Sequence, residues 1–232
     1  MTRINALLLL LVLALPTAVG AAEEENVSRA NELLFLTDHL ANVSQPGTLR
    51  YEFHKEAREE KGFTDELDIR VTRINDDGSK HCEVDYFTGE RERFFPPIDH
   101  ATGNPVLLAF LQRDVRDMEQ RTGGSWRYFQ KRMKIALADA AAVEPVTLSV
   151  AGHRVEGTRV RITPFVGGRY RKRFANLADK YYVFTLSEAV PGGIYRLRSV
   201  VPADDPSGPP RIEEVLTFEE LTHRTARAEA GD

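Results

Sequence analysis

Few residues in this 232-residue chain could carry chemistry, and they are widely spaced. Ser125, in GGSWRYF, lacks the second glycine and the preceding strand that a nucleophile elbow requires, so we interpret it as a helix N-cap. His81 and Cys82 are adjacent on an expected strand, where neighbouring side chains point to opposite faces and cannot form a nucleophile–base pair. Cys82 is better explained as a small buried apolar residue.

The histidines also give no catalytic or metal-binding pattern, because no two of them have the spacing of metal ligands. The sequence therefore predicts neither a metal site nor a cofactor. A hydrolase whose residues converge only in three dimensions stays open as the least favoured alternative. The six histidines are His39, His54, His81, His100, His153 and His223.

The best-defined element is a helix in the stretch GNPVLLAFLQRDVRDMEQRTGG, residues 103–124. Asn104 is a suitable N-cap, Pro105 fits the first helical position, and Gly123 can end the helix. Helical spacing predicts an apolar stripe on one side and a polar face opposite to it. The stripe consists of Leu107, Leu108, Leu111, Val115 and Met118 with Phe110 beside it, and the polar face of Arg113, Arg116, Asp117 and Gln120.

Asp114 lies on the flank of that stripe, about 60° from Leu111 and about 40° from Met118 around the helix. A carboxylate beside an apolar stripe is costly unless it is paired. We favour an ion pair with an arginine of a following helix, such as Arg127 or Arg132. The alternatives are a polar group at the mouth of a cavity and a catalytic acid.

A basic segment follows in GGRYRKRF, where Arg169, Arg171, Lys172 and Arg173 surround Tyr170. Cationic and aromatic side chains together suit an anionic headgroup, a phosphate or an acidic protein surface. The alternative is a solvated loop between strands. Nucleic acid is not an expected partner, because the chain has a formal net charge of −4 and carries an export signal.

That signal is expected in residues 1–22, where Arg3 precedes a short apolar run and small residues. The run is too short for a stable membrane anchor. We therefore expect an exported, soluble, monomeric protein of the bacterial periplasm with a mature N-terminus between Ala21 and Glu23. Cys82 is the single cysteine, so no internal disulfide can form.

The rest of the chain reads as one N-terminal helix and two sets of strands. Residues 28–42 have helical apolar spacing, and NDDG at 75–78, Ala151-Gly152 and Pro191-Gly192-Gly193 are turn signals. A second helix is expected from Ser125. Period-two alternation predicts strands near 48–57, 67–71, 82–86 and 91–95, and, after Pro145, at 146–150, 158–165, 180–187, 194–202 and 212–221.

This order predicts an α+β fold with a curved antiparallel sheet, an incomplete barrel of about 8–10 strands. The N-terminal helix and an inserted pair of helices, at about 104–141, should cover one face. The expected single domain spans 23–224, followed by a frayed tail at 225–232.

An amphipathic helix followed by the aromatic strand LRYEF, in an exported chain of this length, resembles the periplasmic lipoprotein-carrier (LolA/LolB-like) superfamily. The resemblance lies in element order and implies an apolar ligand held between sheet and helices. No diagnostic motif matches, so no binding residue is carried over. The long paired helices and the segment Arg169 to Arg173 depart from the family, and another helix-covered antiparallel sheet is the alternative fold.

The favoured function is therefore to bind or carry a lipid or lipid-linked molecule. The alternative is a non-enzymatic envelope accessory protein, which would use the basic segment to bind another envelope protein or an anionic membrane surface. In the carrier, the helix of residues 105–122 should face the ligand with Leu107, Phe110, Leu111, Asp114, Val115 and Met118.

Overall fold

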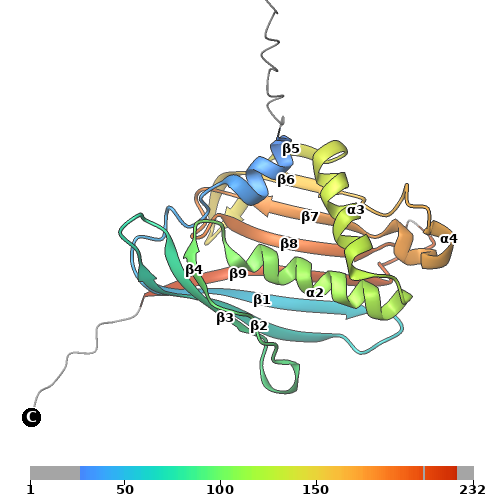
Figure 1. The fold of residues 1–232 in the computed structure, drawn as a ribbon, viewed down its shortest axis with the longest axis horizontal. Coiled ribbons are helices and arrows are strands. Elements are labelled where there is room, and N and C mark those ends of the chain that lie inside the picture. The colour runs from blue at the N-terminus through green and yellow to red at the C-terminus, as the bar shows by residue number, and fades with distance from the viewer. Residues whose placement is uncertain (1–26, 206, 224–232) are drawn as a thin grey trace, which may run out of the picture.

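The structure is a computed structural model that describes residues 27–205 and 207–223. The predicted signal sequence and the predicted tail lie outside the described residues. Nine strands form one antiparallel sheet in the order β4-β3-β2-β1-β9-β8-β7-β6-β5 (Figure 1). The strands are β1 (Gly47–Ala57), β2 (Phe63–Ile74), β3 (Lys80–Tyr86), β4 (Ile98–Ala101), β5 (Ala142–Val150), β6 (His153–Ile162), β7 (Tyr181–Leu186), β8 (Ile194–Val201) and β9 (Ile212–His223).

The sheet is open, because β4 and β5 at its two edges do not pair with each other. Successive strands pair as hairpins on each side, and β1 pairs with β9 to join the two halves. This pairing between Gly47 and His223 brings the ends of the domain together at the middle of the sheet. The predicted α+β fold with an incomplete antiparallel barrel is confirmed.

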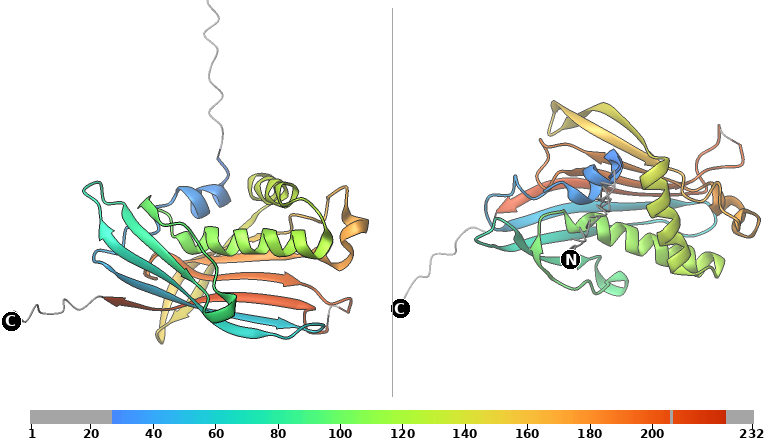
Figure 2. Two further views of the ribbon diagram at one scale, coloured as in Figure 1. Left: turned by 60° about the horizontal axis from the view of Figure 1, so that its bottom comes forward. Right: turned by 45° about the horizontal axis from the view of Figure 1, so that its top comes forward.

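The helices lie on one face of the sheet, as Figure 2 shows. Among the described residues, no helix covers the other face. Ser28 Oγ donates a hydrogen bond of 2.8 Å to the carbonyl of Leu137 and so ties the N-terminal helix to α3. The helical segments are α1 (Arg29–Asn31) with η1 (Glu32–Leu36), η2 (Gly89–Arg91), α2 (Pro105–Thr122), α3 (Trp126–Asp139), α4 (Arg171–Phe174) and η3 (Ala175–Asp179).

Alternation explains which face of each strand is covered. In β1, Leu49, Tyr51 and Phe53 are buried against the helices, whereas Glu52 and His54 are exposed. The turn at 151–152 has two successive positive φ angles, 48° at Ala151 and 81° at Gly152. Positive φ at both positions is the geometry of a two-residue hairpin.

The N-terminal helix is shorter than predicted, because the helical backbone ends at Leu36 rather than at residue 42. Thr37 is extended, and the chain then turns to bury His39. One ring nitrogen of His39 lies 2.8 Å from the Leu33 carbonyl, and the other accepts from the backbone N–H of Asn104 at 3.3 Å. The helix ends before His39 because the buried imidazole needs these two hydrogen-bond partners.

The strand predicted at 91–95 is also wrong. A helical turn, η2, occupies Gly89–Arg91 and places the Arg91 guanidinium 2.6 Å from buried Asp65. Beyond η2 a single bridge, between Arg93 and Tyr86, pairs this segment with β3, and a regular strand, β4, forms only after Pro96 and Pro97. In the second half, β5 begins before Pro145, not after it. An edge strand tolerates proline, because its outer N–H groups have no ladder partner.

Candidate ligand-binding site

Helix α2 is fixed to the sheet at its N-terminal end by Asn104. The side-chain oxygen of Asn104 accepts from the Val106 N–H, and its Nδ2 donates to Tyr51 Oη and to the Gly192 carbonyl, both at 2.8 Å. Gly192 has φ +74°, and a Cβ there would lie 2.6 Å from the Asn104 amide. At the other end, Gly123 adopts φ +61°. Both predicted helix caps are confirmed.

The face that α2 turns to the sheet differs from the predicted stripe. Phe110 lies at the centre of the buried face, whereas Leu108 points outward with 44% of its surface exposed. Arg113 is not on the solvent face either, because it contacts β9. Of the residues predicted to face a ligand, Leu107, Phe110, Asp114, Val115 and Met118 are buried in this structure and Leu111 is half-buried.

Asp114 is completely buried and forms an ion pair, but not with the arginines that the sequence suggested. Lys180, at the start of β7, donates to one carboxylate oxygen, and the Tyr182 hydroxyl donates to the other. Both partners are buried as well. Burial and the neighbouring Asp114 carboxylate raise the pKa of Tyr182 well above its ordinary value, so Tyr182 is a fixed hydrogen-bond donor.

The two suggested arginines have other contacts. Arg132 Nε donates to the Pro164 carbonyl at 2.8 Å, and the Arg127 guanidinium lies over the Trp126 ring at 5.1 Å. Lys180, which directly precedes β7, is the partner of Asp114 in their place, because its side chain reaches α2. The polar-group and catalytic-acid alternatives for Asp114 both need an accessible carboxylate, which this conformation does not offer.

A second buried carboxylate, Glu214 in β9, is bound by Arg113, the residue before Asp114 in α2. Arg113 donates to both of its oxygens, at 2.7 and 2.9 Å, and Lys55 Nζ lies 3.4 Å away. Burial alone would raise the pKa of Glu214, but the hydrogen bonds and charge of Arg113, with Lys180 and Lys55 nearby, lower it to about 2. The Arg113 guanidinium also covers the Phe53 ring at 4.7 Å.

Together these groups form what we call the α2 ion-pair network. It contains the Asp114–Lys180 and Arg113–Glu214 pairs and extends through Lys55 and Glu60 to Arg121 near the end of α2. The contact between α2 and the sheet is therefore partly ionic, beside the apolar contacts of Phe110 and Met118.

The alternation that predicted the strands contained a signal for this network. Lys55 shares the inward register of Leu49, Tyr51 and Phe53, and Lys180 shares that of Tyr182 and Phe184. A charged residue in the buried register of a strand needs a partner across the core. Glu214 is in the same position relative to Leu216 and Phe218 in β9.

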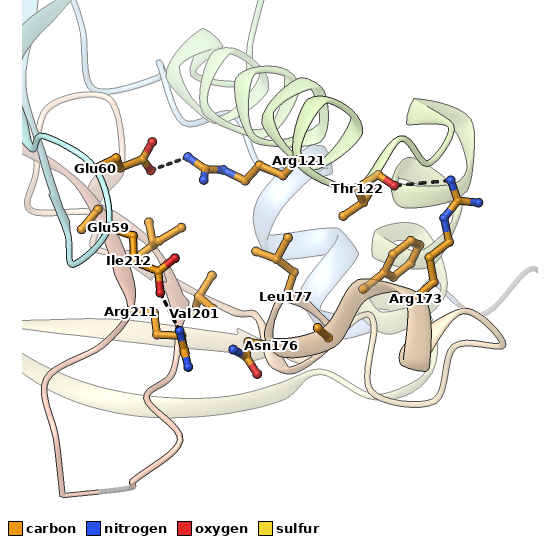
Figure 3. A pocket seen from close by; sticks show the side chains of 13 residues that line it. Glu59, Glu60, Arg121, Thr122, Arg173, Asn176, Leu177, Val201, Arg211 and Ile212 are labelled. Atoms are coloured by element: carbon orange, nitrogen blue, oxygen red, sulfur yellow. Dashed lines mark hydrogen bonds and ion pairs between the residues drawn. The ribbon is translucent and has the colours of Figure 1, made fainter.

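The pocket beside the C-terminal end of α2 has a volume of about 490 Å³ (Figure 3). Its lining comes from the β1–β2 connection, the end of α2, the segment after α4, and the ends of β8 and β9. Phe174, Leu177, Val201 and Ile212 supply apolar surface. Arg121, Arg173 and Arg211 supply positive charge, with Glu59 and Glu60 beside them.

None of the predicted ligand-facing residues lines this pocket, although Met118 lies one helical turn before Thr122, which does. Of the predicted basic segment, only Arg173 lines it, and this arginine also donates to the Gly123 carbonyl at 3.1 Å. Arg171 pairs with Asp179 at 2.8 Å, and Lys172 is exposed. The alternative prediction for this segment was a solvated loop. In the structure, part of it forms the short helix α4.

The other residues considered for catalysis, Cys82 and Ser125, lie in positions that are explained by the fold. Cys82 is buried, and burial raises the pKa of its thiol to about 11, which makes it a poor nucleophile. Ser125 precedes α3 in an extended conformation as predicted, but its hydroxyl makes no capping bond. The Glu119 carboxylate accepts from the Trp126 N–H at 3.2 Å. Within residues 27–205 and 207–223, no cluster of His, Cys, Asp or Glu could hold a metal ion.

The fold and the pocket define a domain in which helices cover one face of an open antiparallel sheet and leave an opening at one end. The resemblance predicted from element order is confirmed at the level of fold class, since the open sheet and its covering helices are those expected. None of the helices between residues 27 and 223 has the length and hydropathy of a membrane-crossing segment.

Comparison with known proteins gives similarities in structure only. No protein-family model matches the chain, and no curated protein matches it in sequence. Mycobacterium tuberculosis lipoprotein LppX is similar with a TM-score of 0.34 and 8% identity, over 80% of this chain and 91% of LppX. A LolA superfamily protein from Nitrosomonas europaea has a TM-score of 0.23 and 10% identity, over 86% of this chain and 94% of the other.

A DUF1329 family protein from Desulfovibrio piger is similar with a TM-score of 0.29 and 11% identity, over 87% of this chain and 94% of that protein. TM-scores below 0.5 carry no argument about ligand or mechanism. The functional argument therefore rests on the geometry of this chain.

Proposed function

We propose that this protein is exported to the periplasm and there binds or carries an apolar ligand, a lipid or a lipid-linked molecule, between the sheet and α2. The observation that best supports this is the pocket of about 490 Å³ at the end of α2. That volume is in the ordinary range for small-molecule sites, about 300–1,000 Å³. Its apolar lining suits an acyl chain, and its arginines, of which Arg121 and Arg211 pair with Glu60 and Glu59, suit an anionic head.

The ligand chain would enter at Leu177 and Ile212 and pass under α2 from its C-terminal end. Met118 and Val115 would then contact it first, followed by Leu111, Phe110 and finally Leu107. Asp114 would remain with Lys180 as the polar group beside the chain. This ordering follows from the helix, because Met118 lies one turn from the pocket and Leu107 lies about four turns from it.

Helix α2 must move for a chain to occupy that space, since its inner face is packed. The outer end of the α2 ion-pair network, the Arg121–Glu60 pair at the pocket, makes such a movement less costly there. An apolar contact loses roughly 25 cal/mol for each Å² exposed to water, whereas the separated ions of a buried pair regain their hydration. The Arg121–Glu60 pair, at the pocket, would be the first to separate.

Filling the pocket tests its role as the entrance. Leu177→Trp and Ala57→Trp should each weaken binding of a fluorescent fatty-acid analogue about tenfold, which corresponds to about 1.4 kcal/mol. The added indole would occupy the volume that the analogue needs. Binding is measured by fluorescence titration of the purified protein.

Val143→Trp is the matched control, because Val143 is exposed on the edge strand β5 and does not line the pocket. It should bind the analogue as the unmodified protein does. Equal binding by all three variants would contradict an entrance at this pocket.

A further inference from the structure

Positive charge is concentrated on α3 and on the segment before and within α4. Residues 126–139 and 164–174 contain eight lysines and arginines and a single carboxylate, Asp139, in a chain whose formal net charge is −4. The rest of the chain is therefore strongly acidic. The eight cations are Arg127, Lys131, Arg132, Lys134, Arg169, Arg171, Lys172 and Arg173.

The two segments form one continuous region of the molecule. The Tyr128 ring of α3 lies 5.1 Å from that of Tyr170 and 5.7 Å from that of Phe174. Arg132 of α3 donates to the Pro164 carbonyl. Figure 1 shows α4 beside the end of α3 that follows α2, and Figure 2 agrees. We call this region the α3–α4 surface.

Among the described residues, most cations of the α3–α4 surface form no ion pair. On the strands, arginines such as Arg50, Arg70 and Arg198 are paired with carboxylates. Within the described part of the chain, Arg171 is the one cation of the surface that forms an ion pair. Like charges held together repel one another, so a bound anionic surface would relieve that repulsion. Of the residues that the structure describes, the exposed cations of this surface without an ion pair are Arg127, Lys131, Lys134, Arg169, Lys172 and Arg173, the last of which donates to the Gly123 carbonyl.

Exposed apolar side chains are interspersed among these charges. Trp126 begins α3 with 42% of its surface exposed, and the Arg127 guanidinium lies over its ring. Ile135 is 36% exposed, and Val166 is 44% exposed. Tryptophan has an apolar ring with a polar N–H and is favoured at the boundary between lipid and water. A basic helix with exposed tryptophan and aliphatic residues is typical of a surface that lies on a bilayer.

We infer that the α3–α4 surface docks on a bilayer containing anionic phospholipid. These exposed cations would contact the headgroups, and Trp126 would enter the headgroup layer. This docking does not require the proposed carrier function. Arg173 and Phe174 belong to both the surface and the pocket, so a docked molecule would hold its pocket beside the membrane.

The single tryptophan of the chain makes the docking directly measurable. Trp126 emission should shift to shorter wavelength with phosphatidylcholine vesicles that contain about one third phosphatidylglycerol, and the protein should sediment with them. Neither change should occur with pure phosphatidylcholine. Raising the salt should release the protein, because the headgroup contacts are electrostatic.

Two double variants locate the surface. Lys131→Gln with Lys134→Gln, and Arg169→Gln with Lys172→Gln, should each weaken vesicle binding about tenfold or more, since each basic residue near an anionic surface contributes separately. The control is Arg73→Gln with Arg154→Gln, which removes the same charge from exposed positions outside the surface. It should bind as the unmodified protein does.

Equal loss in all three double variants would mean a net-charge effect and would overturn the inference. Equal binding to both kinds of vesicle, or to neither, would also overturn it. Binding only to an acidic protein would assign the surface to a protein partner instead. Melting curves of the variants should match the unmodified protein, and fatty-acid binding should be retained, which separates this result from failure of the carrier function.

Discussion

Asp114→Ala should lower the free energy of unfolding by about 3–5 kcal/mol, the cost of removing one partner of a buried ion pair. The substitution would leave the Lys180 ammonium and the Tyr182 hydroxyl buried without their acceptor. Their desolvation is then uncompensated, which costs more than the lost interaction itself. Urea denaturation followed by circular dichroism measures the change.

The double variant Asp114→Leu with Lys180→Met distinguishes an unpaired charge from a simple loss of packing. It replaces both ions by apolar side chains of similar size, and such replacements of buried pairs are often neutral or stabilising. Most of the stability lost in Asp114→Ala should therefore return. A double variant as unstable as the single one would contradict this account of the pair.

Acid should destabilise the protein through Glu214. Its pKa in the folded state is about 2, below the ordinary 4.5 of a glutamate, so the carboxylate form is favoured by folding. The resulting stability, about 3 kcal/mol, is fully present above about pH 4.5 and is lost as the pH falls towards 2. The measurement is the denaturation free energy between neutral pH and pH 3.

Glu214→Gln should be less stable at neutral pH and should show a weaker decline in acid, because it removes the titrating group. Glu213→Gln is the matched control: this neighbour pairs with Arg198 and is partly exposed. Its decline in acid should resemble that of the unmodified protein. Parallel pH profiles for Glu214→Gln and the unmodified protein would show that Glu214 does not carry the acid sensitivity.

Local sequence signals predicted most of the fold. The Asn104–Pro105 start and the Gly123 end of α2 depend on groups within one helical turn, so the pattern was sufficient. The same holds for the hairpin at Ala151 and Gly152, where short-range backbone geometry decides the turn. The errors at 37–42 and 91–95 arose where a distant contact decided the backbone, His39 with Asn104 and Arg91 with Asp65.

The candidate site could be predicted only in part. The helix that borders it was identified, but its rotation about its axis was not, because Arg113 turns inward to reach Glu214, a hundred residues away in the chain. The pocket is formed by segments from both halves of the chain, which are far apart in sequence and are brought together by the β1–β9 pairing and by α2. No local pattern reports such a meeting. Lys55 and Glu214, in the buried register of their strands, are a local signal of a buried network that the prediction did not include.

Native mass spectrometry of the protein purified from the periplasm, with extraction of co-purified lipids, tests the central claim most directly. We expect a mature chain without residues 1–22 that carries one bound lipid or lipid-linked molecule, with less of it retained in Leu177→Trp than in the control Val143→Trp. A chain that is always free of apolar molecules, even after incubation with lipid, would contradict the carrier account and favour an accessory protein.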